Sequence, residues 1–294
     1  CDRATVFRLG RDVAVFDAVH AGSGPELVAA MVGRELSDLY PDRAERTRGE
    51  PGLDVSGLSD GASFADVSFT VGRGEIVGLA GLIGSGREEL IDTLYGLRRA
   101  RAGTVRLDGE RLRIRSAADA VKAGMVLVPR DRRNDGLVLP MTVAENVNVG
   151  ALFGQPGTTA VEAEALTRDA LMTSGLWHLR DTPAEDLTLM QEKRLEIARA
   201  LATRPLILLL DEVMAGLRPG EAREAIDLVR RIRDTGVTVI FIEHVMPVVK
   251  DLADRVIVMD YGRMIAEGSY AEVTANPAVI EAYLGTDEEG EDAL

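Results

Sequence analysis

Short apolar runs, each followed by polar or glycine-rich residues, recur along the chain between stretches of helical periodicity. Residues 75–79, 206–210 and 237–242 form such runs, and their length and composition are typical of strands buried on both faces. After the first run, Leu90, Ile91 and Leu94 fall at helical spacing. The pattern favours an open α/β sheet, and none of the runs approaches the ~20 residues that a transmembrane helix needs.

A segment near the start of the chain is repeated near its end. Residues 2–11 read DRATVFRLGR and residues 254–263 read DRVIVMDYGR, so five of ten positions are identical at an offset of 252. Each copy is followed by a polar segment and an apolar-periodic helix, predicted over residues 25–36 and 271–284. A period of this length suits duplicated domains and not a solenoid. Chance similarity of two strand-turn segments is the alternative.

The repeat changes the interpretation of the first residue and of the segment that follows. Cys1 aligns with Ala253, just ahead of the repeated strand, so we expect a truncated first domain and not a lipid-modified terminus. No signal peptide is visible at the start. Residues 41–52 are charged and contain two prolines and two glycines, which is linker composition. A second, nearly complete domain is expected from Leu53 onward.

Charge and cysteine content narrow the classes of partner. The 294 residues carry 34 Lys and Arg against 48 Asp and Glu, a formal net charge of −14, which disfavours a nucleic-acid partner. Aromatic residues make up 4%, too few for a base-stacking groove. The single cysteine excludes a disulfide framework within the chain and favours a reducing, cytosolic setting.

A glycine-rich loop connects the first apolar run to the helical pattern. The spacing Gly81-x4-Gly86, with a strand before it and a helix after it, is that of a Walker A phosphate loop, whose backbone N–H groups bind phosphate oxygens. Arg87 stands at the usual lysine position and Glu88 at the hydroxyl residue that ligates Mg²⁺. A turn without a ligand is the alternative. The candidate phosphate-binding residues are Gly81, Gly84, Ser85, Gly86, Arg87 and Glu88.

Polar residues end the two later apolar runs. Asp211 and Glu212 follow residues 206–210, and His244 follows residues 237–242 after one intervening glutamate. Ligand sites of open parallel sheets lie at the carboxyl ends of the strands. We therefore expect Asp211 to orient Mg²⁺, Glu212 to polarise the attacking water and His244 to contact a γ-phosphate. A histidine satisfied at a loop end is the alternative for His244.

These motifs, in this order, resemble those of ATP-binding cassette (ABC) transporter ATPases. Residues 1–150 are similar to tandem-cassette importers of ribose, xylose and galactose: MVGRELSDLYP resembles the end of a first cassette. DVSFTVGRGEIVGLAGLIGSGREEL and GMVLVPRDRRNDGLVLPMTVAEN resemble the second. In those importers the second Walker A motif also commonly has arginine for lysine. Residues 187–285, with LTLMQEKRLEIARALATRPLILLLDEVMAGLRP, IEHVMPVV and VIEAYLG, resemble the ATPase of branched-chain amino-acid importers. The change falls within residues 151–186.

The sequence departs from the pattern of active cassettes at several positions. Residues 187–191 read LTLMQ in place of the signature LSGGQ, and the side chains of Leu189 and Met190 are expected to obstruct the approach to an opposing cassette. Arg130 stands at the Q-loop glutamine, and no aromatic residue for adenine stacking precedes Phe64. Asp211, Glu212 and His244 match the pattern of active cassettes, but these departures and Glu88 predict near-background ATP hydrolysis by the isolated chain.

The resemblance implies a P-loop NTPase cassette of the α/β class with a RecA-like core. An antiparallel β-subdomain is expected from residues 53–74 and 103–128, and a small helical subdomain from residues 138–186. The expected domains are 1–48, a cassette remnant plus linker; 49–286, the ATP-binding domain; and 287–294, an acidic tail.

The implied function is the peripheral ATP-binding subunit of an importer, most readily for a monosaccharide, on the cytoplasmic face of the membrane. Its implied cofactors are ATP and Mg²⁺. The implied partners are membrane permease subunits, a second cassette and, indirectly, a solute-binding protein. The alternatives are a branched-chain amino-acid importer ATPase, a nucleotide-binding regulatory cassette and a soluble ABC ATPase without transport.

Overall fold

The structure is a computed structural model that describes residues 3–8, 11–17, 51–130 and 136–284. It divides into two units, residues 1–45 and 46–294, which are described separately. Several expectations fall outside the described residues. They concern Cys1, the helix over 25–36, most of the linker and the acidic tail.

The first unit contains an antiparallel hairpin that has the same register as a hairpin of the second unit. Strands β1 (Ala4–Arg8) and β2 (Arg11–Phe16) pair with a bulge after the third pair. Strands β11 (Arg255–Asp260) and β12 (Arg263–Gly268) pair with a bulge at the same point. Adding the repeat offset to every partner in the first hairpin gives the corresponding pair in the second. The sequence repeat is thus also a repeat of strand register.

The second unit is built on a six-stranded sheet with the order β12-β11-β5-β10-β9-β8. Its further strands are β5 (Ile76–Ala80), β8 (Met125–Val128), β9 (Ile207–Asp211) and β10 (Thr238–Ile242). Strands β11, β5, β10, β9 and β8 are parallel, and β12 is antiparallel to β11. All residues of β5 and β10 are buried, as their continuous apolar runs predict.

A four-stranded antiparallel sheet packs against this core. Its order is β4-β3-β6-β7, from β3 (Pro51–Ser59), β4 (Val67–Gly72), β6 (Ala102–Leu107) and β7 (Glu110–Arg111). Side chains of both sheets, Leu53 and Leu209 among them, share one hydrophobic core. Two of the expected segment boundaries, those of the β-subdomain and of the linker, were wrong. Residues 125–128 pair with β9 in the parallel sheet, and Pro51 and Gly52 belong to β3 and not to a linker.

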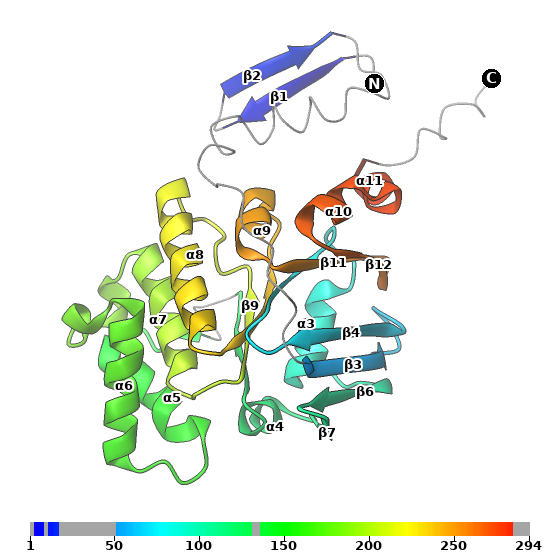
Figure 1. Cartoon of the computed structure of the whole chain (residues 1–294). Coiled ribbons are helices and arrows are strands. Elements are labelled where there is room, and N and C mark those ends of the chain that lie inside the picture. Colours follow the sequence, from blue (N-terminus) through cyan, green and yellow to red (C-terminus); the bar gives the residue numbers. More distant parts are fainter. Residues whose placement is uncertain (1–2, 9–10, 18–50, 131–135, 285–294) are drawn as a thin grey trace. The chain divides into compact units, whose positions relative to one another are not determined.

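Helices complete the second unit, with a separate helical subdomain drawn in green in Figure 1. That subdomain has its own core, to which α5, α6 and α7 contribute, and Trp177 packs against it. Thr142 and Thr159 begin α5 and α6 with reciprocal capping bonds to Glu145 and Glu162. The helices up to α9 are α3 (Arg87–Tyr95), α4 (Ala117–Lys122), α5 (Val143–Gly154), α6 (Ala160–Ser174), α7 (Leu189–Leu201), α8 (Pro219–Asp234) and α9 (Met246–Leu252).

The end of the described chain forms two short helices, α10 (Tyr270–Ala275) and α11 (Pro277–Leu284). A single helix over residues 271–284 was therefore a wrong prediction. Asn276 has an extended backbone, and Pro277 restricts the residue before it to that region, so the helix cannot continue. Within the described residues, no helix is both long and apolar enough to span a membrane.

Candidate functional site: a phosphate loop beside two strand-end carboxylates

The glycine-rich loop lies between the buried strand β5 and the first turn of α3 (Figure 1). At Gly81 a Cβ atom would lie 2.5 Å from the Met259 carbonyl oxygen, so a side chain cannot be accommodated there. Gly86 is the N-cap of α3 with φ of 92°, a left-handed conformation that favours glycine. The loop thus has the tight backbone that the spacing predicts, at a helix N-terminus where anions are stabilised.

Among the described residues, two groups of the loop make no contact that would satisfy or cover them: the Ser85 hydroxyl and the Ile83 side chain at the tip. The Ser85 hydroxyl is buried without a hydrogen-bond partner, whereas its carbonyl accepts a bond from the Gly262 N–H at 3.0 Å. At the tip, the Ile83 side chain is 91% exposed. An unpartnered buried hydroxyl is costly, and a bound phosphate oxygen is the kind of group that would satisfy it.

Arg87 is buried and already has protein partners. Its guanidinium donates to the Gly81 carbonyl and lies 3.5 Å from a Glu88 carboxylate oxygen and 3.7 Å from a Glu212 carboxylate oxygen. The residue is 1% exposed. The cation therefore lies among loop and strand-end acceptors, and a phosphate would compete with them for its donors.

Glu212 is the centre of an ion-pair cluster that draws residues from several elements. Its nearly buried carboxylate lies 3.3 Å from His244 Nδ1 and 3.2 Å from Arg130 Nε, in addition to the contact with Arg87. The backbone of Glu212 has φ of 46°, which is uncommon for a residue with a side chain. Its N–H donates to the Ile242 carbonyl, which fixes the turn after β9 against β10. The structure thus brings the residues expected from four separate motifs together.

Asp211 lies at the end of β9 with an unsatisfied oxygen. Burial raises its pKa to about 6, the Glu212 and Glu88 carboxylates add to that, and Arg130 opposes it. Its Oδ1 is buried without a hydrogen-bond partner. A divalent cation, or water bound to one, would satisfy this oxygen and remove the charge repulsion. Among the described residues no set of three or more His, Cys, Asp or Glu could hold a metal alone. Mg²⁺ usually needs only one or two carboxylates beside substrate phosphates and water, so Asp211 fits it.

Two residues of the site carried no role in the sequence interpretation. Glu243 is 1% exposed, and its carboxylate accepts a bond from the Met214 N–H at 2.8 Å, which holds the segment that follows Glu212. Burial raises the pKa of Glu243. Tyr283 of α11 lies near the backbone of Gly81 and near Arg87, and burial raises its pKa. The only sequence signal for Glu243 is its position directly after an apolar run. No sequence signal indicates that Tyr283 belongs to the site.

The signature segment begins α7 and contributes none of the described contacts of the Glu212 ion-pair cluster. Thr188 caps the helix, and its N–H donates a hydrogen bond to the side-chain oxygen of Gln191 at 2.9 Å. Leu189 is partly exposed near Gly216, but Met190 is 7% exposed and belongs to the core. The expectation that both side chains face an opposing cassette was therefore wrong for Met190. The helical periodicity turns Met190 inward, so the predicted obstruction is left to Leu189 alone.

Comparison with known proteins agrees with this geometry. Residues 64–215 match the ABC transporter family, and residues 263–289 match a branched-chain amino acid ATP-binding cassette transporter family. A nucleotide-free ATP-binding cassette from an ABC transporter aligns with a TM-score of 0.70 and 28% identity over 80% of this chain and 100% of its own. A structure of the ADP conformation of an ATP-binding cassette of an ABC transporter aligns with a TM-score of 0.71 and 28% identity over 80% of this chain and 99% of its own.

Curated relatives include sugar import proteins. A ribose import ATP-binding protein of Rhizobium etli is 39% identical over 97% of this chain and 57% of its own length. An arabinose import ATP-binding protein of Ralstonia nicotianae is 38% identical over 93% of this chain and 55% of its own. The chain thus spans somewhat more than half the length of the curated relatives it matches. On the family match, the fold and the order of its motifs, the chain belongs to the ABC transporter family, as an ATP-binding cassette.

Proposed function

We propose that this chain is the ATP-binding part of an ABC importer for a monosaccharide. The observation that carries the proposal is the convergence of the phosphate loop, Asp211, Glu212 and His244 at the carboxyl edge of one parallel sheet. Monosaccharide import is supported by the ribose and arabinose relatives, which match more than nine-tenths of the chain. The match at residues 263–289 favours branched-chain amino acids as the second candidate solute class.

The proposed assembly follows from the same relatives. Residues 1–48 are proposed to be the end of a preceding cassette with its linker, which the shared hairpin register supports. Residues 49–286 are the ATP-binding domain, and residues 287–294 are an acidic tail. We expect the chain to act at the cytoplasmic face of the membrane with permease subunits and a second cassette, and indirectly with a solute-binding protein.

The residues of the site have distinct proposed roles toward ATP. Backbone N–H groups of Gly84 and Gly86 and the unpartnered Ser85 hydroxyl bind the β- and γ-phosphates, and Arg87 adds charge to them. Asp211, with the Glu88 carboxylate close enough to influence it, would hold Mg²⁺, which would neutralise phosphate charge when bound. Glu212 orients the attacking water, and His244, 3.3 Å from the Glu212 carboxylate, contacts the γ-phosphate.

Hydrolysis by the isolated chain is expected to be close to background. Arg87, Arg130 and His244 all compete with water for the Glu212 carboxylate, so this base is engaged before any substrate enters. Glu88 provides no hydroxyl for the metal, and Leu189 obstructs the signature segment. Loss of one well-placed transition-state donor costs about 10²–10³ in rate, and this chain departs at more than one position. This favours, as the second candidate role, a regulatory cassette that binds ATP with little turnover.

ATP turnover and ATP binding, measured separately, test the proposal. We expect micromolar or weaker affinity, about −8 kcal/mol or less favourable, and turnover that Glu212→Gln does not change. Arg87→Ala should weaken binding by ~1–3 kcal/mol, the worth of a charged hydrogen bond, while the exposed control Arg231→Ala should not. Rapid turnover that Glu212→Gln abolishes would contradict the low-activity part. Absence of ATP binding would contradict the proposal as a whole.

The solute class needs an assay of the complete transporter. Uptake of ribose or arabinose that requires this chain would support the monosaccharide proposal. Uptake of leucine, isoleucine or valine with no sugar uptake would replace it with the second solute class. Arg87→Lys combined with Glu88→Ser should improve Mg²⁺-ATP binding more than turnover, because Leu189 still obstructs the signature segment.

A further inference from the structure

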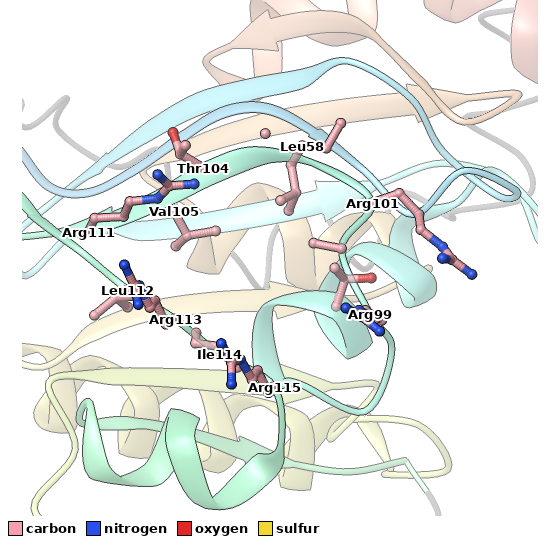
Figure 2. A pocket seen from close by; sticks show the side chains of 14 residues that line it. Leu58, Arg99, Arg101, Thr104, Val105, Arg111, Leu112, Arg113, Ile114 and Arg115 are labelled. Carbon is pink, nitrogen blue, oxygen red and sulfur yellow. The ribbon is translucent and has the colours of Figure 1, made fainter.

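A hollow of about 900 Å³ lies outside the candidate site, between the antiparallel sheet and the end of α3 (Figure 2). Its apolar lining includes Leu58 and Val105, and its lining arginines come from two segments. Arg99 and Arg101 lie on the connection from α3 to β6, and the second group lies on β7 and the connection to α4. That second group is Arg111, Arg113 and Arg115.

The hollow is strongly basic on an acidic protein. Residues 98–115 contain seven arginines and two acidic residues, whereas the whole chain has a formal net charge of −14. Residues 111–115 read RLRIR, and this alternation sorts the side chains into two sets. Leu112 and Ile114 are half-buried and pack against the hydrophobic core, while the three arginines are exposed. The alternation therefore anchors the segment and presents its cations on the hollow.

The arginines beside the hollow have protein partners, which distinguishes them from the five arginines that line it. Arg98 is paired with Asp60 at 3.0 Å, and Arg106 donates to the Gly109 carbonyl. The nearby carboxylate of Asp108 is paired with Arg73 at 2.8 Å. Within the described residues, no hydrogen bond or ion pair is seen for the guanidinium groups of the hollow. These guanidinium groups are therefore available to a ligand.

This hollow is separate from the phosphate loop. The loop precedes the first residue of α3, whereas Thr93 and Arg99 of the hollow lie at and beyond its last turn. A helix of this length spans about 13 Å. None of the lining residues belongs to the loop or to the Glu212 cluster. ATP bound at the proposed site would thus leave the hollow accessible.

We propose that the hollow binds a small organic phosphate that carries at least two phosphoryl groups. Arginine forks bind phosphate oxygens in pairs, and the two arginine segments offer donors from two sides of the same space. The volume lies in the range of small-molecule sites, and the apolar lining suits a carbon skeleton between the phosphates. None of the lining residues is aromatic, so a nucleobase finds no stacking surface. The net charge of −14 disfavours a long nucleic acid or an anionic membrane, because the chain as a whole would repel them.

Calorimetric titration with fructose 1,6-bisphosphate tests the proposal. Fructose 6-phosphate and fructose, with one phosphoryl group and none, are titrated for comparison. The test variant is Arg111→Gln with Arg113→Gln. The matched control, Arg231→Gln with Arg263→Gln, removes two exposed arginines outside the hollow. We expect the bisphosphate to bind more tightly than the monophosphate, and binding to weaken about tenfold or more in the test variant. The control should stay within about twofold of the unmodified chain, and added salt should weaken binding.

Several results would overturn the proposal. One is equal binding by the test variant and the control. Another is loss of bisphosphate binding in Arg87→Ala but not in the test variant, which would place the ligand in the phosphate loop. Binding to phosphatidylglycerol vesicles or to a single-stranded oligonucleotide, without binding of the free bisphosphate, would also overturn it. None of these readouts uses ATP turnover, so failure here is distinguishable from failure of the proposed function.

Discussion

The two copies of the repeated hairpin share their register but not their burial. Strands β1 and β2 pair residue for residue like β11 and β12, including the bulge. In β11 the four central residues are all buried, because β5 pairs along its other edge. In β1, Val6 is buried but Thr5 is exposed. The difference teaches that strand pairing and bulge are encoded within the hairpin, whereas burial depends on the neighbouring strand.

The equivalent arginines of the two hairpins show the consequence. Arg3 pairs with Asp17 at 3.1 Å, and both side chains are largely exposed to solvent. Arg255 occupies the same repeat position but is 12% exposed, and it pairs with Glu75 at 2.8 Å and with Glu267. It also donates to the Thr70 carbonyl of β4. The same residue is thus a surface ion pair in one copy and a link between two sheets in the other.

Replacement of these two arginines gives the largest expected contrast. Arg255→Ala leaves the buried Glu75 carboxylate without its partner, and breaking such a pair costs about 3–5 kcal/mol of unfolding free energy. Arg3→Ala should leave the unfolding midpoint unchanged, because exposed ion pairs contribute little. Urea unfolding of both variants measures the difference. Equal destabilisation would show that the first hairpin is buried as deeply as the second.

The sequence predicted the parts of the fold that have a local signal. Continuous apolar runs identified β5, β9 and β10, and the glycine spacing identified the loop before α3. Residues 125–128 were assigned to the wrong sheet because an apolar strand fits either sheet, and only pairing with β9 decides. The break before Pro277 was missed although proline is a local signal, because the helical periodicity continues across it.

In the candidate site, too, some features could be predicted from a local sequence signal and others depend on tertiary contacts. Asp211, Glu212 and His244 follow strands, so their convergence could be predicted from strand order alone. The partners of Arg87 could not, since they depend on how far a buried side chain reaches between elements. Helical periodicity alone predicts that Met190 faces inward, whereas its position in the signature motif predicts an exposed side chain, and the periodicity is right.

Replacement of Gly262, in the turn of the second hairpin, should have the next largest effect on the free energy of unfolding. Its φ is 74°, and an added Cβ would lie 2.3 Å from the Ser63 carbonyl oxygen, so backbone must move. We expect Gly262→Ala to cost about 2–4 kcal/mol and to weaken ATP binding, because Gly262 also donates to Ser85 of the loop. Thermal unfolding and ATP titration measure the two effects. The corresponding Gly10 lies outside the described residues.

Gly109 provides the matched control for Gly262. It has a similar φ of 81°, but an added Cβ would meet no atom within 4 Å. Gly109→Ala should therefore cost only the left-handed conformation, about 1 kcal/mol, and should leave ATP binding unchanged. If the two variants were equally destabilised, the contact between the hairpin turn and Ser63 would contribute nothing.

Asp60 holds the loop against which that turn packs, and its replacement should cost less than that of Gly262 and should depend on pH. Burial pushes its pKa up, but bonds from the N–H groups of Ala62, Phe64 and Ser63 outweigh it and lower the pKa from 3.8 to about 2. A lowered pKa means that folding is stabilised above the unfolded value, and that this stabilisation is lost as pH falls through the folded value. Asp60→Asn should therefore cost about 2 kcal/mol at pH 7. The difference between variant and unmodified chain should shrink from about pH 4 to pH 2, as followed by urea unfolding. A difference that stays constant across this range would assign the effect to lost packing and not to the carboxylate charge.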